Sequence, residues 1–293
     1  MKYSLIAFIT WGIADLFYKI GNVEKKKYND IKTGIIVGII MGIYATVYLV
    51  INQLQINLIE ILKYLPVSLC YISSMIIGYK GLKYIELSLS SPIQNTSGII
   101  TSILLIIFFK EVLPLPAYIA FILIFVSIIY IYLIEKKEER TFEVNTKKKK
   151  LSLLAIVLPI LYCILDGLGT FLDALYLDKF EIISENSALI AYEYTFLIFA
   201  IIGLIYLKTK KEKLIIHKEK NKILAASFET IGQFFYIYAM ADNSTISATI
   251  VGSYCVLSVL LSRIFLKEKL SLKKYIAVFA TIIGVIMLAF MDI

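Results

Sequence analysis

Histidine and paired cysteines, the residues that many metal and redox sites require, are scarce in this sequence. The one histidine, His217, lies in a basic connection, which excludes a histidine-rich metal site or a histidine proton relay in a membrane. The three cysteines, Cys70, Cys163 and Cys255, all fall inside apolar segments, and no two have CxxC spacing. We therefore expect no metal, no cofactor and no disulfide framework.

Sequence motifs of common enzymes are missing as well. The chain has no Walker lysine, HExxH, GxSxG or paired-glutamate metal signature. An ATP-driven pump is excluded for this chain alone, because it has no nucleotide-binding segment. We expect no enzymatic activity. An intramembrane enzyme and a non-transporting sensor remain the alternatives of another class, although the absence of a soluble output domain disfavours the sensor.

Apolar residues, in contrast, are abundant. They make up 59% of the chain, and the mean hydropathy is +0.82, whereas a soluble domain has roughly 45–50% apolar residues. They form continuous runs of the ~20 residues that cross a bilayer as a helix. The first run, which contains Trp11, lacks a cleavage site and is predicted to be retained. The sequence predicts an all-α integral membrane protein with ten transmembrane helices, at residues 3–22, 33–51, 61–79, 87–109, 114–134, 151–174, 186–207, 223–241, 245–266 and 272–291.

Basic residues are distributed unevenly between the connections. The odd-numbered loops and the helix ends beside them hold all 30 Lys and Arg except Lys2, Lys63, Lys110 and Lys179. Because basic loops stay cytoplasmic, we expect a multi-pass protein of the cell (plasma or inner) membrane with both termini outside. The same distribution explains the net charge of +8, so nucleic acid is not an expected partner.

The two halves of the chain resemble each other at a spacing of 157 residues. Residues 104–120 read LLIIFFKEVLPLPAYIA, and residues 261–277 read LSRIFLKEKLSLKKYIA. We predict a first five-helix repeat at 1–134, a basic connecting loop at 135–150 and a second five-helix repeat at 151–293. Five is an odd number, so the second repeat would be inverted in the membrane, as in many secondary transporters.

Three segments carry a resemblance to a known family. They read FITWGIADLFYKIG, GYKGLKYIELSLSSPIQNTSGIITSILLIIFFKEVLPL and YIYAMADNSTISATIVGSYCVLSVLLSRIFLKEKLSL. This pattern resembles the EamA family of the drug/metabolite transporter superfamily, although Lys110 and Lys267 stand where that family often has glycine. The resemblance implies ten helices in two inverted repeats, a central cavity and alternating access. It also implies cytoplasmic termini, opposite to the distribution of basic residues.

Carboxylates inside the predicted spans are the main candidates for function. Asp15, Asp166, Glu193 and Glu229 would each cost about 2.5–3.5 kcal/mol facing lipid, so we expect them to line a cavity, bind protons or be paired. Asp15 has an alternative partner in Lys19. Polar and aromatic neighbours share their helix faces. The predicted substrate-binding or proton-coupling residues are Trp11, Asp15, Tyr18, Gln94, Asn95, Tyr162, Asp166, Tyr192, Glu193, Glu229, Gln233, Tyr236 and Tyr254.

Other acidic residues are given structural interpretations. Asp173 lies near the end of a predicted helix and is expected to be solvated. Glu111 and Glu268 also stand at helix ends and are expected to be structural. No catalytic and no metal-ligating residue is predicted.

Acids beside aromatic rings, without intramembrane Lys or Arg, suit a cation. A carboxyl group removed from water also binds and releases protons readily. The sequence therefore predicts a secondary-active, proton-coupled transporter of a small polar or cationic organic metabolite. Its expected partners are the lipid bilayer, this substrate and protons. An exporter of neutral or aromatic amino acids, with the acids used only for protons, is the alternative. Phosphorylated substrates are disfavoured, because no mid-span Lys or Arg could hold a phosphate.

Overall fold

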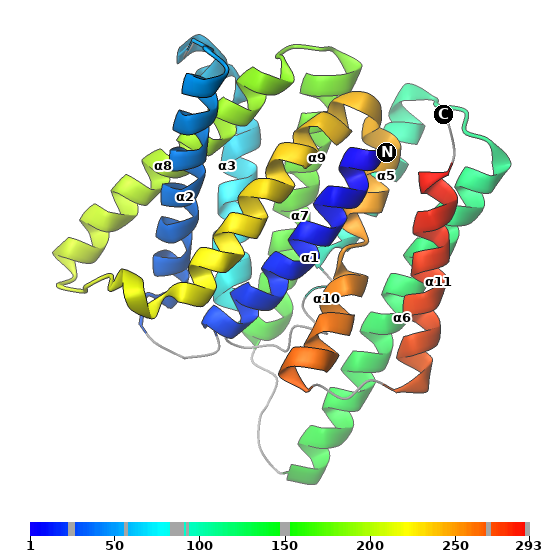
Figure 1. Cartoon of the computed structure of the whole chain (residues 1–293). Helices are drawn as coiled ribbons and strands as arrows, with labels where there is room; N and C mark the ends of the chain where they lie inside the picture. The colour runs from blue at the N-terminus through cyan, green and yellow to red at the C-terminus, as the bar shows by residue number, and fades with distance from the viewer. Residues whose placement is uncertain are drawn as a thin grey trace.

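The computed structural model describes residues 1–22, 27–55, 58–82, 91, 94–146, 153–267 and 271–290. These residues are mostly helical, joined by short turns and irregular connections, without a strand among them (Figure 1). Short 3-10 and π-helical segments, η1 (Leu175–Lys179), η2 (Ile216–Lys218) and η3 (Ser262–Leu266), extend or connect the helices. The α-helices are α1 (Lys2–Asn22), α2 (Asn29–Ile51), α3 (Leu58–Gly81), α5 (Thr96–Phe109), α6 (Leu115–Thr146), α7 (Leu153–Ala174), α8 (Glu185–Thr209), α9 (Lys220–Gly252), α10 (Cys255–Leu261) and α11 (Leu272–Ala289).

Seven helical stretches within the described ranges are long and apolar enough to cross a membrane. The longest, Lys220–Leu266, covers two of the predicted spans, 223–241 and 245–266. Its backbone leaves helical geometry at Asn243 (φ −159°, ψ 96°), between those two spans. The prediction of an all-α integral membrane protein is confirmed by the helical structure and by these seven apolar stretches.

Helix α6 differs from its prediction. It continues to Thr146, so most of the expected loop 135–150 is helical, because its Glu, Lys and Arg residues are good helix formers. The predicted start of the fourth span near residue 87, the end of the connecting loop and Glu268 lie outside the described residues.

Glycines determine how closely α2 packs on α8. Gly34, Gly38 and Gly42 recur every fourth residue and form one face of α2. A Cβ atom on Gly38 would lie 2.1 Å from the backbone oxygen of Phe196 in α8. Small residues at this spacing allow two transmembrane backbones to approach closely.

The most extensive helix contacts join α1 with α9, α2 with α8, α3 with α7, and α6 with α11. One buried apolar cluster is shared by α1, α2, α3, α7, α8 and α9, and a second joins α6 and α11 to α10 and the end of α9. Figure 1 shows the start of α1 and the end of α11 at the same end of the bundle, with the connection between α8 and α9 at the opposite end.

Large apolar side chains cover much of the outer surface. Val50, Phe108, Phe265 and Phe279 are examples that are at least 61% exposed. A soluble protein avoids apolar surface of this extent, whereas the hydrocarbon of a bilayer accommodates it.

Candidate functional site

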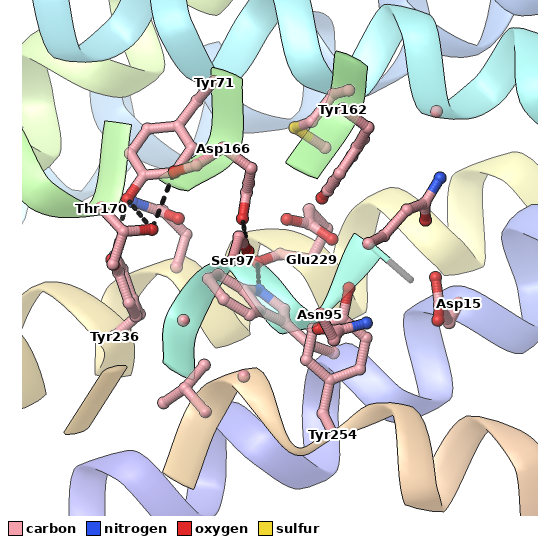
Figure 2. Close-up of a pocket in the computed structure, with 18 of the residues that line it drawn as sticks. Asp15, Tyr71, Asn95, Ser97, Tyr162, Asp166, Thr170, Glu229, Tyr236 and Tyr254 are labelled. Atoms are coloured by element: carbon pink, nitrogen blue, oxygen red, sulfur yellow. Dashed lines mark hydrogen bonds between the residues drawn. The ribbon is translucent and has the colours of Figure 1, made fainter. Parts of the chain in front are cut away.

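A pocket lies between α1, α3, α5, α7, α8 and α9, and Figure 2 shows ten of its residues by label. Every residue predicted from the sequence, except Glu193, lines it. The structure thus brings together Trp11, Asp15, Tyr18, Gln94, Asn95, Tyr162, Asp166, Tyr192, Glu229, Gln233, Tyr236 and Tyr254.

Three carboxylates from three helices line the pocket, and all three are partly accessible. Asp15 of α1 accepts hydrogen bonds from the hydroxyls of Ser91 (2.6 Å) and Ser258 (2.9 Å). The ammonium group of Lys19, its alternative partner, donates to the backbone oxygen of Leu82 at 3.1 Å. Asp15 is therefore held by hydroxyls from both halves of the chain.

The other two pocket carboxylates differ in their partners. Asp166 of α7 accepts a hydrogen bond from the Ser97 hydroxyl at 2.6 Å. The side-chain carboxylate of Glu229 in α9 makes no hydrogen bond or ion pair with another described residue. This carboxylate is consequently the one most available to a ligand or a proton.

Aromatic rings form one wall of the pocket. The indole of Trp11 lies 4.9 Å from the Tyr236 ring and 5.9 Å from the Tyr254 ring, measured between centroids. Its Nε1 donates to the backbone oxygen of Glu229 at 3.2 Å. A Cβ atom on Gly232 would lie only 2.2 Å from the indole. The absence of a side chain at Gly232 therefore allows the Trp11 indole to approach the backbone of α9 near Glu229.

Two polar atoms in the pocket wall, the amide nitrogens of Gln94 and Gln233, have no hydrogen-bond partner within the described part of the chain. Because buried polar groups are nearly always hydrogen-bonded, these atoms are suited to bind a ligand or ordered water.

The charge of the pocket has one sign: its described lining contains neither Lys nor Arg. Within the same ranges no group of three or more His, Cys, Asp and Glu side chains is placed to hold a metal ion. The arrangement can therefore attract a cation by charge and by its aromatic faces.

Glu193 is the one predicted site residue that does not line the pocket. Its side chain is completely buried in α8, and neither carboxylate oxygen has a partner among the described residues. The preceding residue, Tyr192, lines the pocket, and each step along a helix rotates a side chain by about 100°. Tyr194 is turned toward α2, where its hydroxyl lies 3.1 Å from that of Thr46. Three consecutive residues cannot share one pocket face.

Sequence reasoning missed the contribution of α3. Tyr71, Met75, Gly78 and Tyr79 all line the pocket. Their spacing of four, three and one residues places them on one helix face, and this pattern was the available signal. It was hidden because tyrosines are common throughout the chain and usually serve packing.

Asp173 was expected to be solvated, and this was wrong. It is 0% exposed. The hydroxyl of Tyr64 donates to Oδ1, and that of Tyr71 donates to Oδ2 at 3.0 Å. Tyrosines of α3 cover this end of α7, a contact that the sequence of α7 alone does not indicate.

A model of the EamA-like transporter family matches residues 1–133 and 153–290. The chain belongs to the EamA-like transporter family. The predicted membership in the drug/metabolite transporter superfamily is thereby confirmed.

The fold of this EamA-like transporter is also found in a solved structure described only as "Crystal structure of protein". The TM-score is 0.67, and the match covers 97% of this chain and 94% of the other at 10% sequence identity. This likeness concerns the fold alone. A comparison with curated proteins finds no match.

Proposed function

We propose that this EamA-like transporter exchanges a small organic cation for protons by alternating access through the central pocket. The observation that carries this proposal is the meeting of Asp15, Asp166 and Glu229 in one aromatic pocket whose described lining has no basic side chain.

Charge and aromatic contact together favour a cation. Carboxylates supply the attraction, and Trp11, with Tyr236 and Tyr254 beside it, offers π faces worth up to ~2 kcal/mol to a desolvated cation. An empty pocket with three carboxylates has to bind protons or counter-ions, because isolated charges in a membrane are costly. Protons and an organic cation would then compete for the same oxygens, which is the basis of antiport.

Alternating access is supported by signs of an inverted repeat. Helix ends recur 157 residues apart: α1 ends at Asn22 and η1 at Lys179, while α6 begins at Leu115 and α11 at Leu272. Lys110 and Lys267, which have the same spacing, both adopt left-handed backbone conformations (φ 53° and 58°) and end the preceding helices.

The contacts between helices have the same symmetry. Under an exchange of the two halves, α2 corresponds to α8 and α6 to α11, and each pair is in contact. The contact of α1 with α9 corresponds to that of α7 with α3. These pairings support ten membrane crossings in two inverted five-helix repeats, the plan on which many transporters alternate between two openings.

For orientation, we propose that the basic end of the bundle faces the cytoplasm. The connection between α8 and α9, rich in lysine, lies at the end opposite to the start of α1 and the end of α11 (Figure 1). Both termini would then be outside, in a cell membrane with the usual excess of positive charge on the cytoplasmic side.

A binding experiment can use the single tryptophan of the chain, because Trp11 lies in the pocket. Purified protein is titrated with tetraethylammonium and, separately, with neutral and aromatic amino acids, while Trp11 emission and thermal stability are followed. We expect saturable changes with the cation that are lost in Glu229→Gln and retained in Glu181→Gln, an exposed loop residue. A response to amino acids alone that survives Glu229→Gln would contradict the cation proposal.

Transport is then measured in proteoliposomes. An outward-directed cation gradient should move protons inward, and a pH gradient should accumulate the cation against its own gradient. Cation flux with no accompanying proton flux would contradict the exchange.

A further inference from the structure

A second acidic site lies behind the wall of the pocket. Asp173 is 0% exposed, does not line the pocket, and follows Asp166 by seven residues on the same face of α7. Two helical turns separate the two carboxylates by about 10 Å along the axis. We propose that Asp173 is a proton-binding site separate from the pocket, connected to it by Tyr71, and, resting on the proposed function, that its proton is the one exchanged for the cation.

The connection is a chain of hydroxyl groups. The Tyr71 hydroxyl lies 3.0 Å from Asp173 Oδ2, 2.8 Å from the Tyr236 hydroxyl and 3.2 Å from the Thr170 hydroxyl. Tyr71, Tyr236 and Thr170 all line the pocket, and Figure 2 shows these three side chains gathered at one side of it. Tyr71 thus contacts both the buried carboxylate and the pocket.

Among the residues that the structure describes, the remaining surroundings of Asp173 supply no positive charge. From α3 it is faced by Tyr64 and Tyr71, from α9 by Tyr236, and along its own helix by Asp166. From α8, the Tyr192 ring packs edge-on to that of Tyr71, with 5.7 Å between centroids. A buried carboxylate without a cation is stabilised by hydrogen bonds or by a proton, and this site offers both.

A proton can reach Asp173 from the pocket without Tyr236 or Tyr71 becoming ionised. A hydronium ion in the pocket gives a proton to the oxygen of Tyr236. The Tyr236 proton passes to the oxygen of Tyr71, and the Tyr71 proton passes to Oδ2 of Asp173. One O–H bond breaks on hydronium, leaving water, and one forms on Asp173, while both tyrosines remain neutral. The distances of 2.8 and 3.0 Å are those of ordinary hydrogen bonds.

The Tyr71 hydroxyl also transmits the protonation state of Asp173 to the pocket. A tyrosine has one proton to donate. While Asp173 is ionised, Tyr71 donates to it and presents a lone pair to the pocket. Once Asp173 is protonated, Tyr71 accepts from it and points its own proton toward Thr170 or Tyr236. The pocket that receives the cation therefore gains a donor when the proton binds, which disfavours a positive ligand.

Infrared difference spectroscopy on the purified protein tests the proton site without any ligand. After a drop in pH we expect a protonated-carboxyl band that disappears in Asp173→Asn and persists in Glu181→Gln. In Tyr64→Phe the band should shift, because Oδ1 loses its donor. In Tyr71→Phe it should appear about a hundredfold more slowly, as expected for removal of a positioned proton donor. A wild-type spectrum in Asp173→Asn would overturn the proposal.

The two tyrosine variants keep the test decisive if Asp173→Asn does not fold. A wild-type band position in Tyr64→Phe, together with a wild-type rate in Tyr71→Phe, would also overturn the proposal.

The coupling of this proton to cation transport is tested separately with tetraethylammonium. Asp173→Asn should still change Trp11 emission on cation binding but lose accumulation driven by a pH gradient. Full accumulation in Asp173→Asn would overturn the coupling role. If neither the wild-type protein nor any variant binds tetraethylammonium, the proposed function fails. The infrared result still decides whether Asp173 binds the proton.

Discussion

The ammonium group of Lys179 lies 2.5 Å from Oε1 of Glu111 and joins the two halves of the chain. Asp178 Oδ2 is 2.9 Å from the same ammonium group, and Thr245 donates a hydrogen bond to the other oxygen of Glu111 at 2.7 Å. Asp178 in turn accepts hydrogen bonds from the backbone and side chain of Ser244, next to the break in α9. These contacts give Glu111 the structural role expected from its position at a helix end.

Removing Lys179 and removing Glu111 should lower the stability of the protein by unequal amounts. Lys179→Met leaves both Glu111 and Asp178 without their cation, whereas Glu111→Gln leaves Lys179 paired with Asp178. We expect Glu111→Gln to lower the free energy of unfolding by about 1 kcal/mol and Lys179→Met to lower it more. Thermal unfolding in detergent measures both. In the double variant the losses should be less than additive; strict additivity would show that the pair is not coupled.

Gly232→Ala should displace Trp11 from the pocket wall. The added methyl group would lie 2.2 Å from the indole, so the ring must move away from Glu229 and Tyr236. We expect a shift of Trp11 emission without ligand and about a tenfold loss of cation affinity, equivalent to about 1.4 kcal/mol. Gly167→Ala is the matched control, since the nearest atom to its Cβ would be 3.6 Å away. Unchanged emission in Gly232→Ala would refute this account of the wall.

Gly98→Ala should destabilise the contact between α5 and α9. A Cβ atom at Gly98 would lie 2.3 Å from the backbone oxygen of Ala248 and 3.1 Å from Cα of Gly252. Backbone atoms cannot rotate away, so the helices must separate, at a cost of roughly 1–3 kcal/mol. Thermal unfolding of Gly98→Ala and of Gly81→Ala, whose Cβ would be 3.7 Å from its nearest neighbour, provides the comparison. Equal stability of the two variants would count against close packing here.

Glu193→Met should raise stability and leave cation binding intact. Both carboxylate oxygens of Glu193 are buried without a partner among the described residues, and a buried unsatisfied polar group costs about 1–3 kcal/mol. Methionine has a similar length and no such groups. Glu193→Gln, which keeps two polar atoms, should bring no gain. Loss of the Trp11 response to tetraethylammonium in Glu193→Met would instead return Glu193 to the binding site.

The sequence by itself determined the membrane character, the family and most of the pocket residues. Long apolar runs specify membrane helices because transfer of a segment into hydrocarbon depends on its own residues. Asp15, Asp166 and Glu229 could be singled out for the same reason, since an acid inside such a run needs a special environment.

Only the tertiary structure decided which of these acids meet. Glu193 has the same sequence signal as Glu229, yet it is turned into a closed interface while its neighbour Tyr192 reaches the pocket. Asp173 has the signal of a solvated helix end, yet two tyrosines of α3 cover it. Burial and hydrogen bonding depend on which helices are adjacent and how each is rotated about its axis, and that arrangement is set by contacts between residues more than a hundred positions apart in the chain.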